Sequence, residues 1–365
     1  MKKLLFFFTL MISLSFMSCV QNNDNSPVEK LTKNLQSISG KHILFGHQDD
    51  LAYGIGWKSI SGESDVKRIA GSYPALFGWE LGSIGKKDNI DGVPFDSIKV
   101  YIQRAHRLGG INSISWHAEN PLTGNDSWNL ENINVPELLP GGKNHKLLLR
   151  DLELVASFLN SLKDDEGNLI PVIFRPWHEM YGNWFWWGVP HCSSEDYKKL
   201  FVFTIDYLRK EKKLSNLLIA FSPDKNFNTK EEYLKNYPGD DYVDILGLDD
   251  YGDFRENRLD QIVVRLGIIA DLAKEKNKIS AFTETGSDKL AINNWYTTNL
   301  LHVLKANDKT RSISYVMVWR NRDTEHFYVP YKGHQQEEDF LNFVNDKIII
   351  LLEGYNNFLL QNKGK

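Results

Sequence analysis

Eight short apolar runs, separated by segments with helical periodicity, constrain the fold of this chain more than any other feature. The runs begin at His42, Tyr73, Ile111, Leu169, Asn216, Val243, Lys278 and Ile313. Each run is rich in β-branched or aromatic residues, as expected of strands that are buried on both faces of a parallel sheet. The clearest helix-period segments between and after them begin at Phe95, Lys146, Ser193, Leu259, Asn293 and Glu337. This alternation predicts a parallel sheet, either closed as a barrel or open and doubly wound.

Polar and aromatic side chains recur where these runs end, and this favours the barrel. They are His47, Glu80, His117, Glu179, Asp224, Tyr251, Glu284 and Trp319. An open sheet concentrates such residues near one switch point, whereas a barrel gathers all eight strand ends around one mouth. The 365 residues also suffice for one barrel, which needs roughly 250. We therefore predict an α/β fold, a single (β/α)8 TIM barrel over residues 37–362.

The N-terminus has the pattern of an export signal. Lys2 and Lys3 precede an apolar stretch, and Ser18-Cys19 resembles a small-residue cleavage site. The apolar stretch is too short for a permanent membrane span. We predict a signal peptide over residues 1–18, a lipidated Cys19, and a polar linker over residues 19–36. The protein is then exported as a membrane-anchored lipoprotein, in the periplasm or at the cell surface, and Cys192 has no disulfide partner.

The charge of the chain limits its partners. A formal net charge of −4 provides no basic field for nucleic acid, and membrane contact is expected only through the lipid anchor. The glycines after the first run do not match a dinucleotide-binding loop, so no cofactor is expected. We expect a monomer. The ten Trp, fifteen Tyr and twenty Phe residues fit either a large core or surfaces that stack on sugars, and composition does not choose between them.

The segment FRPWHEMYGNWFWWG, residues 174–188, is the strongest candidate for chemistry. A strand leads into Glu179, which is then surrounded by aromatic residues. Desolvation there raises a carboxyl pKa and keeps the group protonated for general-acid work. The alternative is a structural glutamate paired with Arg175, and we favour the functional interpretation. Of the neighbouring tryptophans we expect Trp184 to line a cleft, whereas Trp295, in a helix-period segment, is expected to fill the core.

A second carboxylate, Glu284, ends the apolar run ISAFTETG over residues 279–286. Hydroxyl and amide donors around it favour the ionised form that a nucleophile requires. Alone, the motif is equally consistent with a glutamate that caps the next helix. Together with Glu179 it forms the pair of carboxylates used in glycoside hydrolysis, with retention of configuration if they lie roughly 5–5.5 Å apart.

Three segments in this order, WHAENP (residues 116–121), FRPWHEMYGNWFWWG and FTETG, resemble glycoside hydrolase family 26, whose best-known members are endo-β-1,4-mannanases. The resemblance implies that Glu179 is the acid/base and Glu284 the nucleophile. It further implies that His178 orients the nucleophile by a hydrogen bond and that Tyr251 contacts the same carboxylate. The residues it places along the sugar subsites are His117, Trp184, Trp319 and Arg320.

Other polar clusters have simpler interpretations. The runs at residues 47–50 and 117–119 could be metal ligands, but hydrogen bonding to sugar hydroxyls or between loops fits them better, so no metal is expected. The DDYGD segment, residues 249–253, lacks the later ligands of a calcium loop. Asp224 is equally consistent with substrate contact and with capping its loop.

The leading hypothesis is a retaining endo-β-1,4-mannosidase that acts on mannan, galactomannan or glucomannan. The loop-like insertion Asn120–Lys143 after the third run could narrow the cleft and favour mannobiose release. Because the family also contains β-1,3-xylanases and mixed-linkage glucanases, the shared motifs leave the polysaccharide open. A different class, a non-catalytic glycan-binding lipoprotein, would have lost a carboxylate, and both are present.

Overall fold

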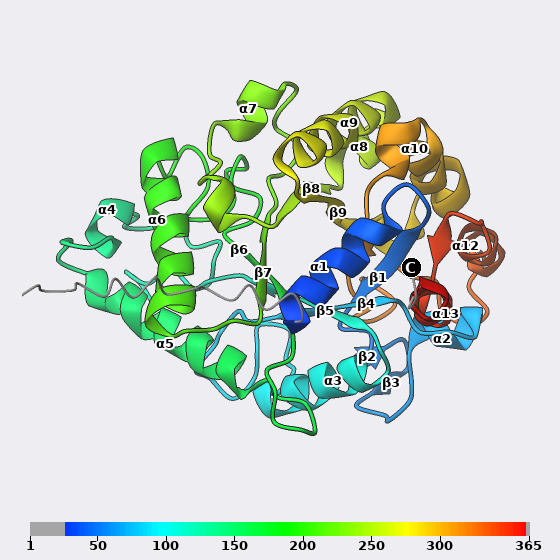
Figure 1. Ribbon diagram of the computed structural model, residues 1–365, viewed down its shortest axis with the longest axis horizontal. Helices are drawn as coiled ribbons and strands as arrows, with labels where there is room; N and C mark the ends of the chain where they lie inside the picture. The colour runs from blue at the N-terminus through cyan, green and yellow to red at the C-terminus, as the bar shows by residue number, and fades with distance from the viewer. Residues whose placement is uncertain (1–25, 363–365) are drawn as a thin grey trace, which may run out of the picture.

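The structure is a computed structural model that describes residues 26–362, and its centre is a closed ring of eight parallel strands (Figure 1). Neighbours in the chain pair along the ring, and the last strand pairs with the first. This closure confirms the (β/α)8 barrel, and each strand lies within a run predicted from the sequence. The barrel strands are β1 (Ile43–Gln48), β4 (Leu76–Glu80), β5 (Ile111–Trp116), β6 (Val172–Pro176), β7 (Leu217–Phe221), β8 (Ile245–Asp250), β9 (Ile279–Thr285) and β10 (Tyr315–Val318).

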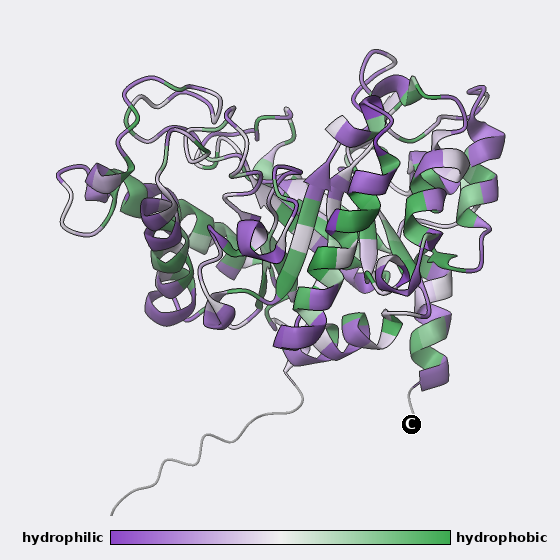
Figure 2. Cartoon of the chain, turned by 90° about the horizontal axis from the view of Figure 1, so that it is seen from above, coloured by the Kyte–Doolittle hydropathy of each residue, from purple (hydrophilic) through white to green (hydrophobic). Residues whose placement is uncertain are grey.

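Helices surround the ring, with their apolar faces turned inward and their polar faces outward (Figure 2). The longer ones are α3 (Phe95–Arg107), α5 (His145–Ser161), α6 (Ser194–Asp206), α9 (Leu259–Lys276) and α13 (Leu352–Asn362). The shorter ones are α2 (Asp65–Ala70), α4 (Val135–Leu138), α7 (Lys230–Leu234), α8 (Gly252–Arg255), α10 (Leu301–Lys305), α11 (Asp308–Arg311) and α12 (Glu337–Val344). Single π-helical turns extend α6 (Tyr207–Glu211) and precede α10 (Trp295–Leu300). Short 3-10 turns cover Asp240–Tyr242 and Asp288–Leu290. Across residues 26–362, no helix is long and apolar enough to cross a membrane.

The first helix, α1 (Pro27–Ile38), corrects the predicted linker over residues 19–36. Ser26 caps it in a reciprocal capping box with Glu29, and Pro27 occupies its first turn, where a missing N–H is harmless. The helix forms because one face is apolar and is buried in the barrel. The part of the predicted linker before residue 26, the signal peptide and Cys19 lie outside the described residues.

Helix α1 lies across one end of the ring (Figure 1) and closes it. Its buried side chains Leu31, Leu35 and Ile38 pack into one cluster with inward-facing residues from every barrel strand. Those strand residues include Leu44, Leu76, Ile111, Ile173, Leu218, Ile245, Ile279 and Tyr315. The N-terminal end of the barrel interior is therefore a filled apolar core.

Two small strand pairings were not predicted. A hairpin joins β2 (Tyr53–Gly54) to β3 (Trp57–Lys58). The run after Glu337 was expected to stay helical, but α12 ends at Val344 and β11 (Ile349–Ile350) pairs with the start of β1. The isoleucines prefer a pleated strand, and β1 offers backbone groups there, so tertiary pairing overrides the helical period.

Candidate active site

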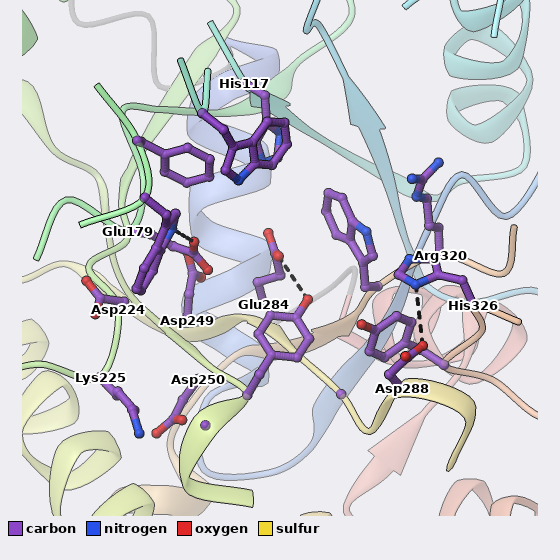
Figure 3. A pocket seen from close by; sticks show the side chains of 18 of the residues that line it. His117, Glu179, Asp224, Lys225, Asp249, Asp250, Glu284, Asp288, Arg320 and His326 are labelled. Carbon is purple, nitrogen blue, oxygen red and sulfur yellow. Dashed lines mark hydrogen bonds and ion pairs between the residues drawn. The ribbon is translucent and has the colours of Figure 1, made fainter. Parts of the chain in front are cut away.

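A cavity of about 770 Å³ opens at the C-terminal ends of the barrel strands (Figure 3). Six of the eight strand-end residues singled out in the sequence line it, namely His117, Glu179, Asp224, Tyr251, Glu284 and Trp319. The other two lie deeper: Glu80 supports His117, and the buried His47 contacts Asp50 with 2.8 Å between Nδ1 and Oδ1. The mouth predicted from the strand ends is thus a single cavity with carboxyl, imidazole and aromatic groups in its wall.

Glu179 follows β6 and is held in an unusual backbone conformation. Both Trp177 and Glu179 have φ values near +55°, in the left-handed region that non-glycine residues rarely adopt. The Glu179 N–H donates to the Ser222 carbonyl at 2.8 Å, which ties this turn to the loop after β7. On the side chain, Trp184 Nε1 donates to Glu179 Oε2 at 2.6 Å. Strain of this kind persists where the surroundings enforce it, and it aims the carboxyl into the cavity.

The surroundings of Glu179 favour its neutral form. Burial is the largest influence, and the nearby carboxylates of Glu284 and Asp224 add to it, so that the pKa of Glu179 is raised to about 8. The Trp184 hydrogen bond and the Arg175 charge act in the opposite direction but are smaller. A carboxyl that stays protonated at neutral pH can donate its proton to a leaving group.

Glu284, near the end of β9, accepts hydrogen bonds that suit a carboxylate. Tyr251 Oη donates to Glu284 Oε1 at 2.8 Å, as Figure 3 shows, and Arg175 Nη2 donates to Glu284 Oε2. These donors hold both oxygens of Glu284 in fixed positions in the cavity wall. The alternative in which Glu284 caps the following helix does not describe these contacts.

Arg175 occupies the interior of the barrel between two acids. Its Nη1 donates to Asp249 Oδ2 at 2.6 Å, and its Nη2 donates to Glu284 Oε2. Burial opposes its charge, but the carboxylates of Asp249 and Glu284 outweigh burial and raise the Arg175 pKa further. The sequence alternative that paired Arg175 with Glu179 is therefore wrong, because the guanidinium is committed to Asp249 and Glu284.

His178 makes a different contact from the hydrogen bond that the resemblance implied. Its Nε2 is 3.2 Å from Nε2 of His117, and its Nδ1 has no hydrogen-bond partner among residues 26–362. The hydrogen bonds to Glu284 come from Arg175 and Tyr251 instead, because those side chains project inward from β6 and from the end of β8 toward β9. Burial and the nearby charges of Arg175 and His117 hold the pKa of His178 well below its ordinary value, so this imidazole is neutral.

His117 is fixed from below by Glu80. Oε2 of Glu80 lies 2.7 Å from His117 Nδ1, and Oε1 accepts the His117 backbone N–H at 2.7 Å. Burial opposes the Glu80 charge, but attraction to His117 and the surrounding donors lower the Glu80 pKa to about 2. Burial likewise opposes the His117 charge, yet Glu80 raises the His117 pKa. The pair therefore fixes the imidazole ring of His117 in the cavity wall.

The predicted sugar-contact residues meet in this cavity. His117, Trp184, Trp319 and Arg320 all line it. Arg320 Nη1 lies 2.6 Å from Asp91 Oδ1 and 3.3 Å from Tyr53 Oη, so its guanidinium is held in place. Trp295 is buried in the core, as expected, and so are Trp186 and Trp187.

Sequence reasoning missed several residues of the wall, chiefly Trp128, Asp91, Asp288, His326 and Tyr328. Trp128 belongs to the loop over Asn120–Lys143 and stacks on His117, with ring centroids 5.3 Å apart and an angle of 17°. It also packs against Phe185 and remains 47% exposed. The insertion itself was visible in the sequence, but which of its side chains would reach the cavity was not.

In the part of the chain that the structure describes, no group of three or more His, Cys, Asp or Glu side chains could hold a metal ion. Cys192 is buried, and burial raises the pKa of its thiol to about 12. The wall of the cavity consists mainly of carboxyl groups, histidines, aromatic rings, two arginines and a lysine.

Comparison with known proteins identifies the family. The model of glycosyl hydrolase family 26 matches residues 20–310. The chain belongs to glycosyl hydrolase family 26. Among solved structures of this family, a β-mannanase from Bacteroides ovatus is 43% identical, with a TM-score of 0.86 and coverage of 90% of this chain and 96% of that chain. An endo-β-1,4-mannanase from Cellulomonas fimi is 34% identical with a TM-score of 0.85, covering 90% of this chain and 76% of that chain.

A curated family 26 relative, the mannan endo-1,4-beta-mannosidase of Bifidobacterium adolescentis, is 33% identical over 351 residues. The match covers 88% of this chain but only 34% of that protein, so the chain spans about a third of its length. A second relative with the same name, from Bacillus subtilis, is 33% identical over 221 residues, which is 57% of each protein. The similarity therefore covers most of this chain for the first relative and just over half of it for the second.

Proposed function

We propose that this protein is a retaining endo-β-1,4-mannosidase that hydrolyses internal bonds of mannan, galactomannan or glucomannan. The observation that carries the proposal is a pair of carboxyl groups, Glu179 and Glu284, in the wall of one cavity but in different surroundings. Glu179 is kept neutral by burial and by neighbouring acids, whereas Glu284 accepts hydrogen bonds from Arg175 and Tyr251. Relatives named as mannanases support the choice of mannan.

In the proposed reaction, Glu284 attacks the anomeric carbon and forms a covalent glycosyl-enzyme while Glu179 protonates the departing oxygen. Glu179 then removes a proton from the incoming water, which releases the sugar and restores both carboxyl groups. Tyr251 and Arg175 hold Glu284 in position for attack. The sugars on either side of the bond are bound by His117, Arg320 and the rings of Trp184 and Trp319.

The product is proposed to be mannobiose, released by a cleft that the loop over Asn120–Lys143 narrows. The support is Trp128, which this loop stacks on His117 and which remains about half exposed. An aromatic wall at that point stacks on a sugar and limits how far the chain continues. Product analysis over time tests this step: mannobiose is expected among the earliest short products, and early short products without mannobiose would contradict it.

The substrate is tested with pure mannan, β-1,3-xylan and mixed-linkage glucan at equal concentration. We expect turnover on mannan that exceeds the other two by at least tenfold. Turnover on xylan or glucan without turnover on mannan would overturn the substrate and leave the mechanism standing. Binding to all three without release of reducing sugar would instead indicate a glycan-binding protein.

We further propose that the protein is exported and anchored through a lipid on Cys19, after removal of residues 1–18, and that it acts as a monomer. The support is the order of basic, apolar and small residues before Cys19. Labelling of growing cells with a radioactive fatty acid tests the anchor. Incorporation into the unaltered chain and its loss in Cys19→Ser are expected, and equal labelling of both would contradict the proposal.

A further inference from the structure

Asp224, which follows β7, is a buried carboxyl with one oxygen unused. Only 3% of the residue is exposed, and it lines the cavity. Asn226 Nδ2 donates to its Oδ2, whereas Oδ1 has no hydrogen-bond partner within residues 26–362. A buried acceptor without a partner is unfavourable, by an amount comparable to a lost hydrogen bond. Asp224 Oδ1 can therefore accept a hydrogen bond from a ligand that enters the cavity.

The place of Asp224 in the cavity indicates which ligand group arrives there. Figure 3 shows Asp224 and Lys225 at one end of the cavity and Arg320 and His326 at the other, with Glu284 between them. Glu179 lies toward the Asp224 end. Because the acid protonates the oxygen of the leaving group, the leaving sugar extends from Glu284 past Glu179. The end that contains Asp224 is therefore the leaving-group side.

The loop after β7 is built to hold Asp224 still. Asn226 Nδ2 also approaches the Tyr181 carbonyl at 3.4 Å, so one amide connects the Asp224 carboxylate to the segment that carries Glu179. The Glu179 N–H bond to the Ser222 carbonyl joins the same two loops. A rigid acceptor beside the acid is suited to recognise a hydroxyl group whose position is fixed by the bond being cleaved.

We propose that Asp224 binds a hydroxyl group of the sugar on the leaving-group side, through its unpaired Oδ1. The inference rests on the proposed function, since it assigns one end of that active site. It resolves the open question of whether Asp224 touches substrate or caps its loop: Asn226 holds one oxygen, and the substrate takes the other. Asp224 thereby helps the enzyme to select a sugar as leaving group.

The test compares two substrates that differ only on the leaving-group side. Mannotetraose places sugars there, whereas an aryl β-mannobioside with a good leaving group places none. Asp224→Asn keeps the shape of the side chain but replaces an acceptor with an amide. We expect its kcat/KM on mannotetraose to fall by about tenfold, as for the loss of one hydrogen bond. Its kcat/KM on the aryl substrate should stay within about twofold, and Asp224→Ala should behave in the same way.

A second readout measures transfer of the glycosyl group to a sugar that enters from the leaving-group side. When mannobiose is added to the aryl-substrate reaction, it competes with water for the glycosyl-enzyme from the leaving-group side. Asp224→Asn should then lower the ratio of transfer product to hydrolysis product by about tenfold. Asp308→Asn, which alters a 97% exposed carboxylate on α11, is the matched control and should change neither ratio nor rate.

Equal losses on both substrates would overturn the inference, because they would assign Asp224 to the structure of its loop. An unchanged ratio of transfer product to hydrolysis product would overturn it too, because a loss confined to mannotetraose would then act through the acid Glu179. Full activity of both variants on mannotetraose would overturn it as well. If the unaltered protein fails to cleave mannotetraose at all, the proposed function fails instead. The two failures are therefore distinguishable.

Discussion

The two ends of the barrel interior differ in almost every respect. At the N-terminal end, α1 and the first inward-facing residue of each strand form a filled apolar cluster. At the C-terminal end the same strands present Arg175, Glu80, Asp249 and Glu284 to the interior, with many hydrogen bonds and a cavity above them. One end gains stability from burial, and the other holds charges in positions that serve chemistry. Substitutions at the two ends should therefore separate stability from activity.

Arg175→Met gives the largest expected effect, because it removes a buried charge that two acids share. Asp249 and Glu284 would be left in the barrel without a positively charged partner, which lowers the free energy of unfolding by about 3–5 kcal/mol. Loss of the hydrogen bond to Glu284 should also lower kcat by about 10³-fold. Urea unfolding and steady-state kinetics measure the two effects. Arg107→Met removes an exposed ion pair with Asp165 and serves as control, with neither quantity changed. An Arg175 variant with normal stability would contradict the buried network.

Leu35→Ala tests the opposite end. Leu35 is fully buried between α1 and the strands, so its truncation leaves a cavity and lowers the free energy of unfolding by about 2–4 kcal/mol. Because the change lies far from the mouth, kcat and KM should remain those of the unaltered protein. Leu360→Ala alters an equally large but 63% exposed residue and should leave stability unchanged. A fall in kcat for Leu35→Ala at temperatures where it is folded would show that the ends are coupled.

Tyr251→Phe removes one hydroxyl from Glu284 and leaves the ring. The lost hydrogen bond of 2.8 Å positions the nucleophile, so kcat should fall by about 10²-fold while stability is nearly unchanged. Tyr242→Phe, on the 3-10 turn away from the cavity, is the matched control. A decrease of less than threefold in kcat would remove Tyr251 from the positioning of Glu284.

Trp184→Phe gives the smallest expected effect, a shift in the pH profile. The acid must be protonated, so kcat/KM of the unaltered protein should fall as pH rises through about 8, the raised pKa of Glu179. The Trp184 N–H stabilises the ionised form of Glu179, and its loss raises that pKa further. The alkaline limb should therefore move to higher pH, whereas Trp128→Phe, which does not contact Glu179, should leave the limb in place. A shift of the Trp184→Phe limb to lower pH would show that the Trp184 N–H does not stabilise the Glu179 carboxylate.

The sequence predicted the barrel because parallel strands buried on both faces have a strong local signature. The eight runs, the order of the helices and the gathering of strand ends followed from periodicity alone. Helix α1 was missed although its signals were present, namely Ser26 before Pro27 and the spacing of Leu31, Leu35 and Ile38. The apolar face of α1 is short and lies among polar residues in the sequence. Its role becomes clear only from the structure, where it covers one end of the barrel.

The site was predictable in its residues but not in its connections. Inward-facing residues of β9 alternate as Ile279 and Ala281, which would turn Thr283 inward and Glu284 outward. A register shift in the pairing with β8 places Glu284 opposite Asp249 instead, and so brings the carboxylate to the cavity. Such a bulge has no clear sequence signal. The sequence did not reveal the partners of Arg175 either, because they belong to strands that are distant from it in the chain.

The measurement that tests the central claim most directly is the mass of Glu179→Ala after reaction with an activated aryl β-mannobioside. Such a leaving group needs no proton, so the glycosyl-enzyme should form, but without its base it should break down slowly. We expect the protein to gain the mass of one mannobiosyl group, with the peptide that contains Glu284 carrying it. A label on another residue, or rapid turnover with no added mass, would contradict a mechanism in which Glu179 and Glu284 act on the same sugar.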